Sequence, residues 1–123
     1  NDYRRSLISY ESARRGYLLA TDNVKFAVID AWRRMTEARK SYDFNVTSVQ
    51  INERRVEEAE LRAELGLGDV QDTVDSQTDL TASRTELTRA IVNHNIAKLE
   101  FWRDVGLLYV RDDGSLEEGI AAQ

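Results

Sequence analysis

The sequence predicts an all-α protein, a long antiparallel coiled-coil helical hairpin with helices at about residues 3–65 and 70–107. The 123 residues include no proline and only 6 glycines, which leaves little material for turns. A heptad repeat of mainly apolar residues runs through the first half of the chain. Gly66 and Gly68 form the one pair of closely spaced glycines in the first hundred residues, so the chain is expected to reverse there.

The first helix is predicted by alternating steps of three and four residues from Leu7 to Ala63, where thirteen of seventeen positions are apolar. A repeat held this long without proline predicts one helix with a left-handed supercoiled seam, roughly 90 Å long at 1.5 Å per residue. Further apolar residues such as Phe26, Trp32 and Phe44 lie off this seam. The helix is therefore expected to contact more than one neighbour, as in a bundle or a multi-helix wall.

The turn between the helices carries a stop signal and a start signal. Glycine tolerates the left-handed conformation that ends many helices, so Gly66 is expected to end the first helix, with Leu67 packing back on Leu61. Asp69 is the expected N-cap of the second helix. Asp72, three residues later, adds negative charge at the positive end of the helix dipole.

The second helix has a noisier pattern, and Gly106 is expected to end or bend it. We assign residues 1–111 to the hairpin and 112–123 to a flexible tail, because Asp112 to Ser115 is rich in turn residues and an acidic segment follows. The apolar residues that predict the second helix are Val74, Leu80, Leu87, Ile91, Phe101 and Val105, with Ala82, Ala90 and Ala97 alongside.

Composition argues against several classes of function. A net charge of -5 without a basic block speaks against nucleic-acid binding, and the absence of cysteine excludes disulfides and thiolate metal sites. His94 is the only histidine and lacks a carboxylate three or four residues before it, so no metal is expected. Neither a membrane-spanning run nor a signal peptide is visible, and the start at Asn1 rather than Met indicates an excerpt of a larger protein.

Two aspartates just beyond the turn are the main candidates for a functional role. Asp72 and Asp75 are three residues apart and so share one helix face. Capping and dipole pairing explain Asp69 and Asp72 but not Asp75 or Asp79. Paired catalytic acids would need a pocket that a two-helix hairpin does not offer. The segment Gly66-Leu67-Gly68 follows a helix and lacks the Lys-Ser/Thr of a phosphate loop, so we expect no nucleotide, no cofactor and no enzyme activity.

The residues from Leu65 to Leu80 resemble the TolC-like outer-membrane efflux channel family, which has a glycine turn followed by Asp-x-Leu-x-Ala-Gln and a spaced Leu. The segments Ala90 to Ala97 and Arg103 to Leu108 are similar to the family's Ala-x-x-x-Tyr-x-x-Ala and closing Leu-Gly-x-Leu. Upstream, Tyr3 to Ile8 and Ala13 to Arg15, then Asp22 to Val24, are similar to the segment leaving the family's barrel. The similarity covers about residues 2 to 110.

This resemblance implies a trimer in which a β-barrel in the outer membrane continues into a periplasmic α-helical barrel. The chain would be an excerpt of that α-barrel, in contact with the membrane only through a β-barrel it does not contain. The turn residues Gly66, Leu67, Gly68, Asp69 and Val70 would face the adaptor and the inner-membrane transporter. Asp72 and Asp75 would match the acidic positions at the pore entrance, a ring that favours cations.

The implied function is a passive conduit for efflux or type I secretion. Gly68 and Ala63 stand where some members of the family carry an Arg and a Tyr that help to close the entrance. The heptads alone fit a second hypothesis equally well, a structural coiled-coil hairpin of a periplasmic adaptor or scaffold protein. The sequence upstream of Asn1 would distinguish the two.

Overall fold

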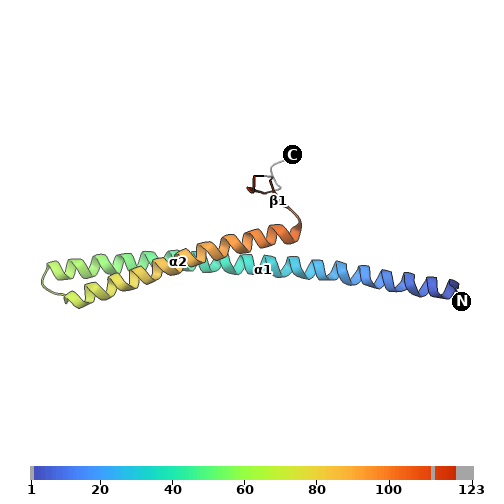
Figure 1. The fold of residues 1–123 in the computed structure, drawn as a ribbon. Helices are drawn as coiled ribbons and strands as arrows, with labels where there is room; N and C mark the ends of the chain where they lie inside the picture. Colours follow the sequence, from blue (N-terminus) through green and yellow to red (C-terminus); the bar gives the residue numbers. More distant parts are fainter. Residues whose placement is uncertain (1, 112, 119–123) are drawn as a thin grey trace. The chain divides into compact units, whose positions relative to one another are not determined.

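The chain forms two long helices followed by a short β-hairpin (Figure 1). The computed structural model describes residues 2–111 and 113–118. Helix α1 spans Asp2–Glu64 and helix α2 spans Val70–Val105; strands β1, Leu108–Val110, and β2, Leu116–Glu118, follow. The predicted all-α helical hairpin is confirmed, and each helix end lies within two residues of its predicted position.

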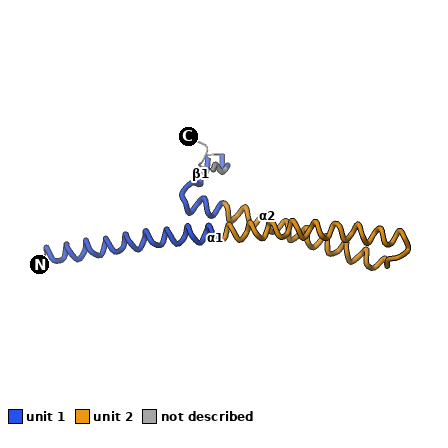
Figure 2. The backbone as a smooth tube through the Cα atoms, turned by 180° about the vertical axis from the view of Figure 1, so that it is seen from behind, with its two compact units in different colours: residues 1–33, 99–123 blue, residues 34–98 orange. Residues whose placement is uncertain are grey.

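Two compact units make up the chain (Figure 2). One comprises residues 34–98, and the other comprises residues 1–33 with residues 99–123. Helix α1 contributes to both units, as does α2. The hairpin turn and every candidate site residue lie in the unit of residues 34–98.

In the unit of residues 34–98, α1 buries the face that the heptad pattern predicts. Every heptad position of α1 in this unit is buried or half-buried, and Val49 is the most enclosed at 8% exposed. Ala38, Ala59 and Ala63 provide small side chains on this seam, which lets the facing helix approach closely. The seam consists of Met35, Ala38, Tyr42, Asn45, Val49, Asn52, Val56, Ala59 and Ala63.

The facing seam of α2 is more polar than predicted. Leu80 and Leu87 lie on it as expected, whereas Val74 and Ile91 are 49% and 41% exposed. Small hydroxyl residues occupy positions on this seam, because a serine can satisfy its hydroxyl group within its own helix when it is buried. The Ser83 Oγ donates to the Leu80 carbonyl at 2.9 Å. The seam consists of Thr73, Ser76, Leu80, Ser83, Leu87, Ala90, His94 and Ala97.

Three contacts between α1 and α2 define one antiparallel register. The Tyr42 and His94 rings stack with centroids 6.4 Å apart, Arg84 Nη2 lies 3.0 Å from Glu53 Oε1, and Gln77 Nε2 lies 3.4 Å from Glu60 Oε1. The two residue numbers of each pair add up to 136 or 137. The register therefore stays constant over the hairpin, as expected for two helices with matching heptads.

The unit of residues 1–33 and 99–123 has a small core around Ala31, which is 1% exposed. Phe101 and Trp102 are half-buried, and their rings meet edge to face with centroids 5.9 Å apart. Residues 2–27 of α1 are exposed except for half-buried Glu11 and Thr21. The apolar side chains of this stretch, such as Tyr3 at 80% and Tyr17 at 72% exposed, therefore lack cover among the described residues.

Gly106 ends α2, as predicted. Its φ is +78°, and backbone bonds from Gly106 N to Arg103 O and from Leu107 N to Trp102 O form the paired pattern of a Schellman stop. Strands β1 and β2 then pair antiparallel, with Tyr109 opposite Glu117. Strand β2 thus lies in the range 112–123 for which a flexible tail is predicted; residues 112 and 119–123 lie outside the described residues.

Candidate functional site at the hairpin tip

Backbone atoms close the turn after α1. Gly66 has a φ of +70°, its N–H donates to the Ala63 carbonyl at 3.0 Å, and the Leu67 N–H donates to the Arg62 carbonyl at 2.9 Å. These two bonds form a Schellman motif, so the prediction that Gly66 ends the helix is confirmed. The predicted packing of Leu67 on Leu61 covers little of either side chain, since they are 79% and 56% exposed.

Asp69 starts α2 as its N-cap. Its Oδ1 accepts the Gln71 N–H at 3.2 Å, and its carbonyl accepts the Asp72 N–H at 3.1 Å. This prediction is confirmed as well. Gly68 lies close to the end of α1, because a Cβ added to it would stand 3.1 Å from Arg62 Cβ and 3.2 Å from Ala63 N. Val70, the first helical residue, is 74% exposed.

Asp72 and Asp75 line one groove beside the tip. The groove has a volume of about 360 Å³ and runs between the last turns of α1 and the first turns of α2. Arginines and a glutamate come from α1, and aspartates come from α2. Its lining consists of Arg55, Glu58, Ala59 and Arg62 from α1, Gly68 from the turn, and Asp72, Asp75, Ser76 and Asp79 from α2.

Polar contacts inside the groove run mainly along each helix. Arg62 Nη2 donates to Glu58 Oε1 at 2.6 Å, an ion pair between residues four apart on α1. Asp75 Oδ1 accepts the Gln71 side-chain amide at 2.8 Å, so Asp75 also has a bond within its own helix. Both partners of the ion pair are well exposed, and such a pair contributes only about 0.2–1 kcal/mol.

Asp79 also lines the groove, although the sequence had not assigned it a place beside Asp72 and Asp75. It follows Asp72 by seven residues, two helical turns, so it lies on the same face of α2. The signal was present in the sequence as three aspartates at steps of three and four. Arg55 and Arg62 were missed for a different reason, because only the register with α2 brings them to the same groove.

The groove presents the carboxylates of Asp72, Asp75 and Asp79 to solvent. Among residues 2–111 and 113–118, no group of three or more His, Asp or Glu side chains is arranged to hold a metal ion. The three aspartates instead form an acidic edge along α2, while Arg55 and Arg62 form the opposite edge. Such an arrangement can attract cations or basic side chains electrostatically.

His94 is half-buried and lies on the α2 seam between Ala90 and Ala97. Its ring stacks on Tyr42 with the planes 24° apart. Its Nδ1 is buried and has no hydrogen-bond partner among the described residues. The stacked rings therefore contribute to the packing between the two helices.

Comparison of the chain with protein-family models, with curated proteins and with solved structures gives no match. The fold and the tip together define a class, an antiparallel two-helix coiled-coil hairpin with an acidic groove at its closed end. Within the described part of the chain, neither helix contains a stretch that is apolar enough to cross a membrane.

Proposed function

We propose that this chain is a periplasmic segment of the α-barrel of a trimeric outer-membrane channel, of the TolC-like efflux type. In this role it takes part in no chemistry. It forms part of the wall of a passive conduit for efflux or type I secretion, and its tip meets a periplasmic adaptor and an inner-membrane transporter.

The observation that carries the proposal is the position of Asp72 and Asp75 in one groove beside the closed tip of a long hairpin. These are the two positions that the resemblance assigns to the pore entrance. Repeated in three protomers, the two carboxylates would give a ring of six negative charges. A ring of carboxylates at a narrow entrance favours cations and repels anions.

The length and surface of α1 also support a wall rather than a compact bundle. The helix has 63 residues, and large apolar side chains such as Phe26, at 66% exposed, and Phe44, at 72%, lie away from the seam with α2. Exposed apolar side chains of this size indicate contacts with further helices. A tube of side-by-side hairpins supplies such contacts on both sides of each helix.

Conductance of the intact protein in a planar bilayer tests the acidic ring. We expect a multivalent cation such as hexaamminecobalt(III) to block the wild-type channel, because several carboxylates at one narrow point bind such an ion cooperatively. Asp72→Asn and Asp75→Asn should each weaken the block, and the double variant should remove it.

Glu57→Gln is the matched control for this experiment. Glu57 is an exposed acidic residue of α1 that lies outside the groove, and its substitution removes the same charge. The control should leave the block unchanged. A wild-type protein without cation block, or a block that survives the double variant, contradicts the proposed role of the two aspartates.

The second candidate function is a structural hairpin of a periplasmic adaptor or scaffold protein. The continuous seam of residues 35–63 against α2 favours it, because this packing needs no pore. An adaptor would leave the conductance of a bilayer unchanged. Purified intact protein that inserts no channels but binds a separate outer-membrane channel in solution would support this function instead.

A further inference from the structure

His94 brings an ionisable ring into the contact between α1 and α2. On the α2 seam it lies between Ala90 and Ala97, which are 5% and 9% exposed. On the facing helix its ring stacks on Tyr42, with the ring centroids 6.4 Å apart. Histidine is the side chain whose charge changes between pH 5 and pH 8, so mild acid acts directly on this packing contact.

The Nδ1 atom of His94 is enclosed and has no hydrogen-bond partner among the described residues. In a neutral imidazole one nitrogen carries no hydrogen, so an enclosed Nδ1 can be that nitrogen. In a protonated imidazole both nitrogens carry a hydrogen, and the Nδ1–H would then point into the contact without an acceptor. Burial of a charged donor without a partner is unfavourable, so the packed arrangement suits the neutral ring.

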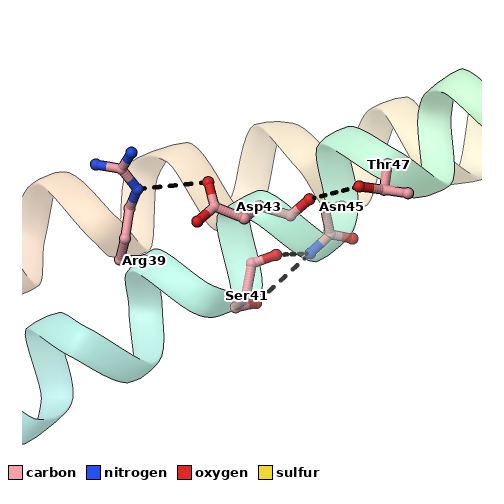
Figure 3. A network of polar contacts seen from close by, with 5 residues as sticks. All are labelled: Arg39, Ser41, Asp43, Asn45 and Thr47. Atoms are coloured by element: carbon pink, nitrogen blue, oxygen red, sulfur yellow. Dashed lines mark hydrogen bonds and ion pairs between the residues drawn. The ribbon is translucent and has the colours of Figure 1, made fainter.

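The polar side chains of α1 at the level of His94 bond within their own helix (Figure 3). Asp43 lies at this level, because its number and that of His94 add up to 137, as in the cross-helix contacts. Its Oδ1 lies 3.4 Å from Arg39 Nε. The side-chain amide of Asn45 donates to the Ser41 carbonyl at 2.8 Å. The carboxylate of α1 at this level is thus engaged with an arginine of its own helix.

The charged groups around His94 include two cations and one anion. Arg39 of α1 lines a cavity of about 400 Å³ together with His94 and Tyr42. Lys98 of α2 follows His94 by four residues and so lies one turn along the same helix face. Asp43 is the anion, and Arg39 offsets its charge. The remaining titratable group is Tyr42, and a phenol is neutral between pH 5 and pH 8. A proton on the ring would therefore add a positive charge where positive charge already prevails.

We propose that His94 makes the hairpin a pH-sensitive switch, in which the neutral ring packs between the helices and the protonated ring loosens the contact of α1 with α2. When the helices separate, water surrounds the ring and it accepts a proton freely. The separated state then binds more protons than the packed state, so the stability of the contact rises with pH. It is complete above the ordinary titration range of a histidine, near pH 6.5, and is lost as the pH falls through this range. The switch needs only the two helices and is independent of the proposed function.

Urea unfolding of the full chain at pH 7.5 and pH 5.5, followed by circular dichroism, tests the switch. A histidine that accepts a proton only after unfolding raises the unfolding equilibrium constant by up to about tenfold between these two pH values. We expect the wild-type chain to unfold at a lower urea concentration at pH 5.5. The His94→Phe variant keeps an aromatic ring against Tyr42 but cannot accept a proton, so its midpoint should change much less. Equal changes in the two proteins would overturn the proposal.

A histidine moved by one position provides the matched control. Asn93 is exposed on α2, so Asn93→His added to the His94→Phe chain restores one histidine at a position that water reaches in the folded state. The unfolding midpoint of this double variant should change with pH as that of His94→Phe does. A loss in acid as large as that of the wild type would show that the place of the histidine is irrelevant, and would contradict the proposal.

Charge reversal at Arg39 gives a test that does not change the histidine. Arg39→Glu places a carboxylate in the cavity beside His94, where it can pair with the protonated ring. This variant loses the ion pair with Asp43 at both pH values, so the comparison between pH values removes that effect. Acid should weaken the variant less than the wild type. A loss in acid as large as that of the wild type would overturn the proposal.

Proton NMR gives a local readout, because the chain contains a single histidine. The ring C–H signals of His94 report its charge, and the stacked rings should show a nuclear Overhauser effect between His94 and Tyr42 at pH 7.5. We expect this effect to weaken as the His94 signals move to their acid positions. An effect of unchanged strength on the protonated ring would show that the charged ring stays packed, and would overturn the proposal.

Discussion

Two glycines, one inside α1 and one just after its end, have opposite requirements. Gly66 adopts a φ of +70° that an alanine can adopt only at a cost of roughly 1–2 kcal/mol. Gly16 lies inside α1, and a Cβ added there meets nothing within 4 Å. The same substitution therefore has opposite signs at the two positions.

We expect Gly66→Ala to lower the free energy of unfolding by about 1 kcal/mol, because the Schellman turn then forces a left-handed alanine. Gly16→Ala should raise it by about 0.5–1 kcal/mol, because alanine is the better helix former. Urea unfolding followed by circular dichroism at 222 nm measures both. Two changes of the same sign would contradict the role of Gly66.

Asp113 fixes the turn between β1 and β2. Its Oδ1 accepts the Ser115 hydroxyl at 2.7 Å and the Ser115 N–H at 2.9 Å. The side-chain hydrogen bond from Ser115 lowers the pKa of the Asp113 carboxyl below its ordinary value, and the backbone bond adds to this. A carboxylate whose pKa is lower in the folded state stabilises that state only while it is ionised.

The ionised Asp113 should therefore stabilise the turn fully at pH values above the ordinary pKa of an aspartate. This stabilisation should be lost as the pH falls through the lowered pKa of Asp113. The chemical shift of the Ser115 amide, followed by NMR over an acid titration, reports the loss. Asp113→Asn keeps an acceptor oxygen but cannot titrate, so its Ser115 amide should not show the transition. A transition that persists in this variant would assign it to another group.

The seams of the two helices differ in how well the sequence predicts them. On α1 the heptad reading found the buried face, because apolar side chains occupy most of its positions, from Met35 to Ala63. On α2 the apolar pattern predicted Val74 and Ile91 as packing residues, but both are exposed. The α2 seam contains Thr73, Ser76 and Ser83, which an apolar pattern does not detect because they are polar. Their small size is what the close packing of the two helices needs.

The α2 seam also limits side-chain size. Ala90 is 5% exposed on this seam, whereas Ala82 is exposed on another face of the same helix. Ala90→Leu should lower the free energy of unfolding by about 1–3 kcal/mol, because the added atoms push the helices apart. Ala82→Leu should change it by less than about 0.5 kcal/mol. Equal effects in urea unfolding would mean that the two helices do not pack closely at Ala90.

The candidate site shows the same division between local and long-range information. Gly66, Asp69 and the common face of Asp72 and Asp75 follow from sequence neighbours, so helix stop, cap and spacing rules predicted them. The arginine edge of the groove depends on the register between α1 and α2, because Arg55 and Arg62 reach it only through antiparallel packing. Rules about residues that are close in sequence cannot predict the register between the two helices.

At the scale of the whole chain, the two ends of α1 should differ in stability. Residues 2–27 are almost all exposed, while residues 35–63 bury one face against α2. A helix in water without packed neighbours is only marginally stable. Hydrogen exchange at low protein concentration, read by mass spectrometry, should show faster exchange for residues 5–27 than for residues 40–62. Equal protection of both stretches in a monomer would contradict this prediction.

The tip of the hairpin is held by main-chain atoms and by one aspartate, while the side chains of Leu65, Leu67 and Val70 are 64%, 79% and 74% exposed. Substitutions at these three positions leave the bonds that close the turn intact. Evolution can therefore change the surface of the tip without changing its course. A few accepted mutations here give the tip a new surface, and the rest of the hairpin can be inherited unchanged.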